Sequence, residues 1–588
     1  MKNLLAYFKN YKLESILGPL FKLLEASFEL FVPLVMAQII DVGIKNRDMA
    51  YIMGRGGILV LLGVVGLACS LTAQYFSAKA AVGIGTKLRN DLFRHINSLS
   101  YREIDIVGTS TLVTRMTSDV NQVQAGINLT LRLFLRSPFI VFGAMIMAFT
   151  INIKAALVFV VAIPLLSVVV FGVMLMTMPL YKKVQKQLDQ VLLTTRENLL
   201  GARVVRAFNR QEDEIARFGR ENDRLVGLQV FVGKISALMN PVTYVIINGA
   251  IIILVWNGAW QVEEGVITQG EVVALVNYMS QILVELVKLA NLIITVTKAF
   301  ACGNRIQNIF EIPAGMETSA TSTNTSSLEA QSGSSSPETE KGTVEFDHVS
   351  LRYYEGGEQA LTDIHFKAKK GATIGVIGGT GSGKSSLVNL IPRFYDVEKG
   401  SVKVDGRDVR EYPLTQLRDK IGVVMQKAVL FKGTIRENLL WGNENASDED
   451  LWEAIKAAQA EEFVLQKRDK LDEMIEQEGR NLSGGQKQRL SIARALVKKP
   501  EILILDDSSS ALDYATDAAL RKSIKDLPGE ITVFIVSQRA SSMLHADTII
   551  VLDDGDVAGM GTHEELLKGC EVYQEIYYSQ FERKEGTK

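Results

Sequence analysis

A glycine-rich segment in the second half of the chain has the residue types and spacing of a phosphate-binding loop. Residues 374–390 have the sequence IGVIGGTGSGKSSLVNL, in which an apolar stretch leads into G-x-x-x-x-G-K-S and the start of a helix. Backbone N–H groups of such a loop point at the phosphates, Lys384 reaches the β- and γ-phosphate oxygens, and the Ser385 hydroxyl can ligate Mg²⁺. The pattern predicts a nucleotide site formed by Gly378, Gly379, Thr380, Gly381, Ser382, Gly383, Lys384, Ser385 and Ser386.

Two carboxylates follow an apolar stretch further along the chain. Residues 501–507 have the sequence EILILDD, which is typical of a buried strand that ends in acids. In a nucleotide site of this kind an aspartate at the strand end holds the Mg²⁺ shell. Asp506 is therefore predicted to share the cation with Ser385.

A third segment, between the other two, predicts a helix whose N-terminus attracts anions. Residues 481–496 have the sequence NLSGGQKQRLSIARAL, where Ser483, Gly484 and Gly485 would open the helix. Exposed N–H groups and the helix dipole both favour negative charge there. Alone, this segment could be a simple helix cap. The order of the three motifs along the chain is far more specific for a nucleotide site.

The first half of the chain predicts a membrane domain. Four stretches carry no charge, and the first of them, residues 56–78, is long enough to cross about 30 Å of hydrocarbon. Two weaker stretches that contain charges flank the four. We expect six spanning helices, at residues 16–40, 56–78, 137–153, 155–181, 235–262 and 272–299. The segments between spans that read as amphipathic helices predict that spanning helices continue beyond the membrane.

Basic residues concentrate in the long segments 79–136 and 182–234. The excess of Lys and Arg places these segments in the cytosol. With six spans, both termini are then cytosolic in a multi-pass protein of the plasma membrane. No cleaved secretory signal is expected, because Met1 to Lys12 is polar.

A change in composition divides the chain. Residues 313–342 are rich in Ser, Thr, Gly and Glu and cannot bury enough apolar surface to fold. We expect an all-α membrane domain at 1–312, a flexible linker at 313–342, for which a phosphorylated or protein-binding segment is the alternative, and an α/β P-loop nucleotide-binding domain at 343–588.

Charge and cysteine content exclude several classes of function. Lys+Arg 64 and Asp+Glu 66 leave a net charge of −2, so no basic field favours nucleic acid. Three widely spaced cysteines, Cys69, Cys302 and Cys570, exclude a disulfide framework and a clustered cysteine metal site, and favour a reducing cytosolic side.

The two weaker spans contain carboxylates, which are expensive inside a membrane and usually face a bundle interior or a watery cavity. Glu25 and Glu29 are one helical turn apart. One hypothesis is that Glu25, Glu29 and Glu285 line a polar substrate cavity. The alternative is that they lie near an interface or form structural pairs.

Taken in order, these features resemble one half-transporter of the ABC exporter family over almost the whole chain. The resemblance implies a Q-loop glutamine at Gln426, an adenine-stacking aromatic at Tyr353, and Mg²⁺ ligation by Ser385, Gln426 and Asp506. It identifies the family's signature motif as Leu482, Ser483, Gly484, Gly485 and Gln486, and the D-loop as Ser510, Ala511, Leu512 and Asp513. In the family the signature motif contacts ATP bound to the opposite subunit, so two composite sites form at a dimer interface.

The chain departs from the family pattern in three places, the third of which comprises two residues. Asp507 stands where competent sites have a glutamate that polarises water, and a base misplaced by about 1 Å loses on the order of 100-fold in rate. Gln538 replaces the switch histidine and cannot become cationic. Gln477 and Glu478 stand where Glu-Arg is usual. Neutral variation in an active enzyme is the alternative interpretation.

The resemblance implies an ATP- and Mg²⁺-dependent ATPase that exports small amphiphilic molecules, drug- or lipid-like, and is in contact with membrane lipid. The altered acid and switch positions beside an intact signature motif predict a heterodimer, in which this chain's own site is degenerate and its signature motif completes the partner's hydrolytic site. A homodimer with two slow sites and an ATP-gated regulator that moves no cargo are the alternatives. The surfaces that couple the domains are expected near 101–106 and 206–212.

Overall fold

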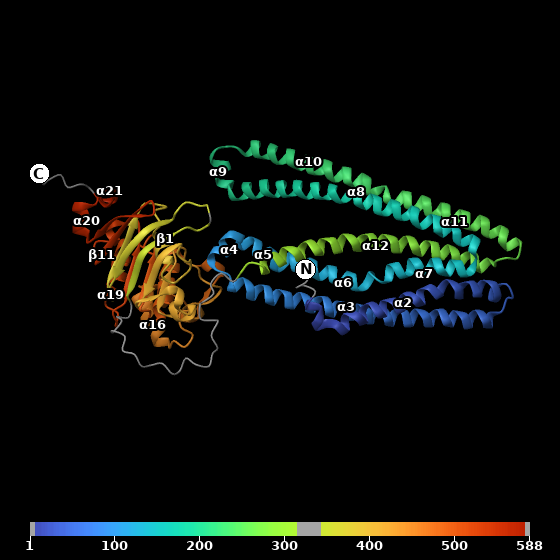
Figure 1. The fold of residues 1–588 in the computed structure, drawn as a ribbon, viewed down its shortest axis with the longest axis horizontal. Coiled ribbons are helices and arrows are strands. Elements are labelled where there is room, and N and C mark those ends of the chain that lie inside the picture. The colour runs from blue at the N-terminus through green and yellow to red at the C-terminus, as the bar shows by residue number, and fades with distance from the viewer. Residues whose placement is uncertain (1–5, 314–342, 355, 582–588) are drawn as a thin grey trace. The chain divides into compact units, whose positions relative to one another are not determined.

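The computed structural model describes residues 6–313, 343–354 and 356–581 (Figure 1). The chain divides into two compact units, Met1–Ser98 with Val107–Pro313, and Leu99–Ile106 with Ala314–Lys588. Except for Pro313, the predicted linker lies outside the described residues.

Six long apolar helical segments form the first unit, which confirms the predicted spans. Each is longer than the roughly 20 residues that a bilayer requires. They cover Ala6–Ile44, Met49–Ser98, Thr109–Ile151, Ile153–Leu200, Gln211–Glu263 and Gln269–Phe310. Their helices are α2 (Lys12–Gln38), α3 (Met49–Ser98), α5 (Thr109–Thr114), α6 (Val120–Leu133), α7 (Arg136–Ile151), α8 (Ile153–Leu200), α10 (Gln211–Ala237), α11 (Met239–Glu263) and α12 (Gln269–Phe310), while α9 (Ala202–Ala207) joins α8 to α10.

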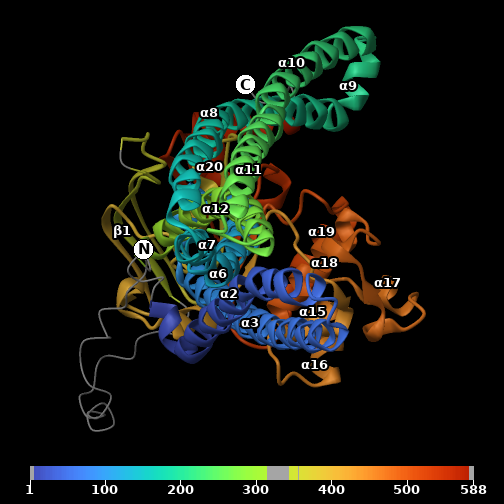
Figure 2. The ribbon, with the colours of Figure 1, turned by 90° about the vertical axis from the view of Figure 1, so that its right-hand side faces the viewer.

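Within this unit α2 packs beside α3, and α8 packs beside α10 and α11 (Figures 1 and 2). Its core contains large side chains such as Phe159 and Tyr278 together with many alanines. Small residues let helix backbones approach closely where lipid provides no hydrophobic driving force. At the start of α12, a Cβ on Gly270 would lie 2.3 Å from the Ala37 carbonyl oxygen, so only glycine fits this crossing.

Three sheets form the described part of the second unit, and the smallest of them is the two-stranded pair β7-β8. A four-stranded antiparallel sheet has the order β2-β1-β4-β5, and a six-stranded sheet has the order β12-β11-β3-β10-β9-β6. In the larger sheet β11, β3, β10, β9 and β6 are parallel and β12 is an antiparallel edge. The predicted α/β fold is thereby confirmed. The strands are β1 (Val344–Leu351), β2 (Leu361–Ala368), β3 (Thr373–Gly378), β4 (Lys399–Val404), β5 (Arg407–Asp408), β6 (Ile421–Val424), β7 (Gly433–Thr434), β8 (Met474–Ile475), β9 (Ile502–Asp506), β10 (Thr532–Val536), β11 (Thr548–Asp553) and β12 (Asp556–Gly561).

The central parallel strands are continuous apolar runs because helices cover both faces of such a sheet. Every residue of β9 is buried, as is every residue of β10. The helices of this unit are α13 (Lys384–Asn389), α14 (Leu414–Asp419), α15 (Ile435–Leu440), α16 (Asp448–Ala457), α17 (Glu461–Leu465), α18 (Gly484–Val497), α19 (Tyr514–Lys525), α20 (His563–Gly569) and α21 (Glu571–Gln580). Most of α4 (Tyr101–Val107) also clusters here.

Candidate nucleotide-binding site

The phosphate-binding loop connects β3 to α13 at the carboxyl edge of the parallel sheet, where ligands bind in open α/β folds. Gly381 and Gly383 have φ of +88° and +92°, a conformation that glycine adopts without strain. A Cβ on Gly383 would also lie 2.6 Å from the Ala360 carbonyl oxygen. The turns of the loop therefore favour glycine at both positions, and packing against Ala360 also requires it at Gly383.

Lys384 is buried inside this loop. Its ammonium donates to the carbonyl oxygens of Gly378 at 3.0 Å and Gly379 at 2.5 Å, and to Ser382 Oγ at 3.3 Å. Burial lowers the pKa of Lys384, since water no longer stabilises its charge. A triphosphate in the loop would restore a favourable partner for that charge.

The predicted Mg²⁺ ligands Ser385 and Asp506 lie together, with the hydroxyl donating to the carboxylate at 2.9 Å. Gln426 follows β6, next to β9, and its amide nitrogen donates to Asp507 Oδ2 at 3.3 Å. Burial raises the pKa of Asp506, and a bound cation would oppose that shift. Hydroxyl, carboxylate and amide oxygens are the hard ligands that Mg²⁺ prefers, so the donor set fits this ion.

Tyr353 lies beside the phosphate-binding loop, and its hydroxyl donates to Ser386 Oγ at 2.7 Å. Burial raises the pKa of Tyr353, which keeps the hydroxyl protonated as a donor. Sequence analysis missed its neighbour Tyr395, whose ring meets that of Tyr353 edge-on at 4.9 Å. Tyr395 also donates its hydroxyl to Asp105 at 2.8 Å, and the ring of Tyr101 contacts that of Phe394 at a tilt of 38°, with centroids 4.6 Å apart. Nothing in the spacing of Tyr395 marks it as a contact of Tyr353.

Asp507 follows β9 with a φ of +46°, a left-handed conformation that is uncommon for residues other than glycine. Its backbone N–H donates to the carbonyl oxygen of Val536, the last residue of β10, at 2.9 Å. Gln538 comes two residues later and is exposed. Asp507 and Gln538, two of the departures from the family pattern, therefore lie at neighbouring strand ends.

Arg539, which sequence analysis also missed, connects the segment after β10, where Gln538 lies, to the predicted D-loop. Its guanidinium donates to the carbonyl oxygens of Ser510 at 3.2 Å and Leu512 at 3.3 Å. Ser510 donates its hydroxyl to the Asp507 carbonyl oxygen at 2.8 Å, and the Asp513 carboxylate caps α19 by accepting from Thr516 N–H at 2.9 Å. These bonds hold the D-loop beside the acid position, and Ala511 is exposed between them.

The predicted signature motif opens α18 with a capping box. Ser483 Oγ accepts from the N–H of Gln486 at 3.3 Å, and the Gln486 side chain accepts from the N–H of Ser483 at 3.0 Å. Ser483 and Gly484 are exposed, whereas Leu482 is buried. A Cβ on Gly485 would lie 3.1 Å from the Ala511 carbonyl oxygen, so the motif packs against the D-loop of the same chain.

The carboxylates of the weaker spans are paired with cations. Arg136 at the start of α7 contacts Glu29 on α2 at 2.7 Å and Glu285 on α12 at 2.8 Å. Lys288 contacts Glu285 at 2.8 Å. Glu25 belongs to a separate pair with Lys22 at 2.5 Å. The structure therefore groups Glu29 with Glu285 in one network and leaves Glu25 in another.

Arg136→Ala is expected to destabilise the membrane domain by about 3 kcal/mol, because it leaves Glu285, which is only 3% exposed, with reduced compensation. Thermal unfolding of the purified full chain measures this effect. The exposed pair Arg210–Asp213 provides the control, since breaking it with Arg210→Ala should change stability by less than about 1 kcal/mol. Equal losses for both variants would contradict the prediction.

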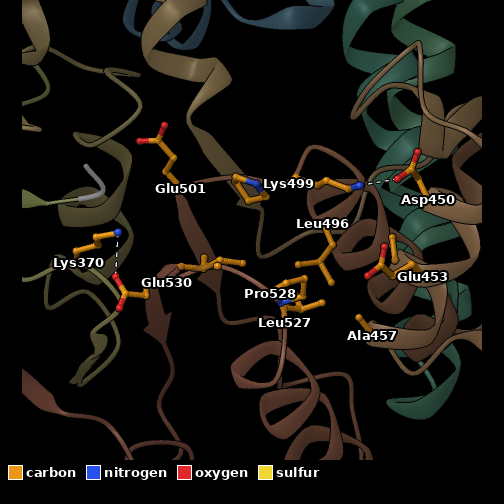
Figure 3. A pocket seen from close by; sticks show the side chains of 14 residues that line it. Lys370, Asp450, Glu453, Ala457, Leu496, Lys499, Glu501, Leu527, Pro528 and Glu530 are labelled. Atoms are coloured by element: carbon orange, nitrogen blue, oxygen red, sulfur yellow. Dashed lines mark hydrogen bonds and ion pairs between the residues drawn. The ribbon is translucent and has the colours of Figure 1, made fainter. Parts of the chain in front are cut away.

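A separate pocket of about 390 Å³ lies at the amino ends of the strands, opposite the phosphate-binding loop. Figure 3 shows the ion pairs Lys370–Glu530 at 2.9 Å and Lys499–Asp450 at 2.5 Å at its sides. Glu501 and Ile531, which line it, come directly before β9 and β10. Its lining, drawn from the described residues, contains none of the predicted nucleotide-site residues.

Comparisons with known proteins agree with this architecture. The model of the ABC transporter transmembrane region matches residues 15–286, and the ABC transporter model matches residues 361–510. The chain is 37% identical over 587 residues to the uncharacterized ABC transporter ATP-binding protein YfiB of Bacillus subtilis, with 100% of both chains covered. It is 30% identical over 596 residues to the ATP-dependent lipid A-core flippase of Hahella chejuensis, covering 97% of this chain and 98% of the flippase. The chain therefore belongs to the ABC transporter family, as a half-transporter whose membrane domain of six helices is fused to an ABC ATPase domain.

Proposed function

We propose that this chain is one half of a heterodimeric ATP-driven exporter of amphiphilic molecules, and that its own ATP site is degenerate. The observation that carries the proposal is Asp507, a carboxylate one methylene shorter than the glutamate of competent sites. Its φ of +46° and its contact with Gln426 at 3.3 Å constrain the short side chain at the end of β9. A base displaced by about 1 Å costs on the order of 100-fold in rate.

The intact signature motif supports a role in trans. Its capping box fixes the first turn of α18, and the exposed positions Ser483 and Gly484 leave N–H groups and a hydroxyl available to an anion. Phosphoryl transfer depends on donors aimed at developing charge. The motif would therefore stabilise the γ-phosphate of ATP held by the partner, whose catalytic glutamate performs the hydrolysis.

The contacts of Tyr395 support a route from ATP to the membrane domain. Tyr353 would stack on adenine, Tyr395 contacts Tyr353, and Asp105 bonds to Tyr395. Asp105 lies on α4, which follows α3 of the membrane domain in sequence. ATP binding would close the two nucleotide-binding domains and shift the membrane helices from inward- to outward-facing, because ATP binds the closed state more tightly. A second coupling surface at 206–212 contains the exposed Phe208.

In this proposal residues 313–342 tether the two domains, and both termini and the nucleotide-binding domain are cytosolic. Two observations favour a lipid- or drug-like substrate. One relative is named as a lipid A-core flippase. The charged network of Arg136, Glu29, Glu285 and Lys288 can also hold polar groups inside an apolar bundle. The membrane would be the plasma membrane.

Rescue of hydrolysis by Asp507→Glu tests the degenerate site. The full chain is co-purified with its partner half-transporter, and the catalytic glutamate of that partner is changed to glutamine. We expect this complex to have almost no Mg²⁺-dependent ATPase. Adding Asp507→Glu and Gln538→His to this chain should raise the ATPase rate of the complex at least roughly 10-fold. With the native partner, Asp507→Asn should leave ATPase within about twofold.

The opposite result would overturn the heterodimer hypothesis in favour of a homodimer. If the chain purifies as a dimer of itself, hydrolyses ATP alone and loses this activity on Asp507→Asn, Asp507 is a working base. Vesicle uptake of fluorescent lipid and of cationic dye then separates transport from regulation, since a regulator would hydrolyse ATP without moving either probe.

A further inference from the structure

Two histidines and two aspartates gather on the β1–β2 hairpin, and none of them is a predicted residue of the nucleotide site. His348 Nδ1 lies 2.7 Å from Asp363 Oδ1, and His365 Nδ1 lies 4.0 Å from Asp347 Oδ1. The imidazole rings of His348 and His365 are stacked, with centroids 5.1 Å apart. The chain contains five histidines in all, so this cluster uses two of them.

Irregular strand pairing explains why these side chains meet. Phe346 pairs with Phe366 and Val349 pairs with Ile364, so Asp347 and His348 together face the single residue His365. Successive strand residues normally point to opposite faces, but a bulge re-aims one of them. His348 has a φ of +50°, which marks the bulged position. The bulge brings Asp347 and His348 to the same neighbour.

A second bulge, on the other strand, places Asp363. Val349 pairs with Ile364 and Leu351 pairs with Leu361, so Thr362 and Asp363 face the single residue Ser350. Asp363 also has a φ of +50°, and its N–H donates to Ser350 Oγ at 3.1 Å. The two opposed bulges direct the Asp363 carboxylate to His348.

We propose that Asp347, His348 and His365 form a binding site for a divalent transition metal of the Zn²⁺ class. One ligand atom from each of the three residues lies within 4.8 Å of the others. In a tetrahedral site with ligand bonds of about 2.1 Å, ligand atoms are roughly 3.4 Å apart. Both imidazoles are exposed, so their side chains can rotate, and on metal binding the ligand atoms would have to move closer together by up to about 1.4 Å. Two imidazoles and one carboxylate suit Zn²⁺ and leave a position for water.

Two neighbouring residues would orient the ligands. When His348 donates its Nδ1 proton to Asp363, its Nε2 is unprotonated and free to ligate, as in the carboxylate–histidine–metal arrangement. The Lys403 ammonium contacts Asp347 Oδ2 at 3.3 Å, so Asp347 Oδ1 is the oxygen that remains towards His365. Lys403 also contacts Glu345 at 3.5 Å. Asp363 and Lys403 are therefore positioning residues of the proposed site.

Because of where the site lies, a bound metal would stabilise the β1–β2 hairpin. The site bridges the two strands whose connecting segment, residues 352–360, contains Tyr353. A metal held by both strands would resist their separation and stabilise the native hairpin by an amount that grows with the logarithm of the free metal concentration above its Kd. Binding of Zn²⁺ should therefore raise the thermal midpoint of the nucleotide-binding domain.

Metal titration of the full chain without a polyhistidine tag tests the proposal. Zn²⁺ is titrated in nucleotide-free protein against a chelating dye. We expect one saturable site per chain, weakened roughly 100-fold or more by His348→Ala with His365→Ala and about 10-fold by Asp363→Asn. The exposed His545 is the matched control, and His545→Ala should leave binding unchanged.

Cobalt provides an independent readout. Co²⁺ at this site should give d–d absorption without thiolate charge transfer, because all three cysteines are buried elsewhere. Nucleotide binding by the double variant shows that its domain is folded. Equal Zn²⁺ affinity in the native chain and the folded double variant, or the absence of saturable binding by the native chain, would overturn the proposal.

Discussion

Lys384→Ala is expected to lower the affinity of this chain's own site for ATP by roughly 100-fold, because a charged hydrogen bond to each of two phosphates is lost, at about 1.5 kcal/mol or more each. Lys384 is already held in the loop by the Gly378 and Gly379 carbonyl oxygens. Because its three N–H donors are already used, nucleotide binding exchanges two of these bonds for stronger, charge-assisted bonds to phosphate. Equilibrium binding of a fluorescent ATP analogue to the full chain measures the change.

Lys370→Ala is the matched control for Lys384→Ala. Lys370 is in the same domain, pairs with Glu530 at 2.9 Å and lies at the amino edge of the sheet. Its loss should change ATP affinity by less than about twofold. An affinity within about threefold of native for Lys384→Ala, in a protein of native thermal stability, would show that Gly378–Ser385 is not the phosphate site.

Ser483→Ala is expected to lower the ATPase rate of the complex with the partner half-transporter by roughly 100-fold, the cost of removing one donor from developing charge. ATP affinity at this chain's own phosphate-binding loop should remain native, because the signature motif would act on the nucleotide held by the partner. Steady-state ATPase of the complex and nucleotide binding by the chain alone separate the two effects.

A second capping box controls for the structural part of this substitution. Ser447 caps α16 as Ser483 caps α18, and its Oγ accepts from the Asp450 N–H at 3.2 Å. Removing either cap should cost about 1 kcal/mol of stability. Only Ser483→Ala should also lower ATPase. A similar drop for Ser447→Ala would mean that the effect comes from stability and not from contact with ATP.

The sequence by itself determined the features that depend on neighbouring residues. Long apolar stretches with few or no charges predict spans because the bilayer requires a length, which can be counted along the chain. The phosphate-binding loop is equally local, since the glycines, Lys384 and Ser385 come from one turn between β3 and α13. Six helices and an α/β nucleotide domain could therefore be expected before the structure was known.

Only the tertiary structure decided which distant side chains meet. Arg136 and Glu285 are 149 positions apart, and their ion pair depends on how α7 and α12 rotate against each other. Tyr395 reaches Tyr353 and Asp105 through packing that no spacing records. Asp347 and His348 would face opposite sides of a regular strand, and a bulge in the pairing with β2 brings both to His365. The pairing register and the rotation of packed helices arise from long-range contacts, and these were absent from the local pattern.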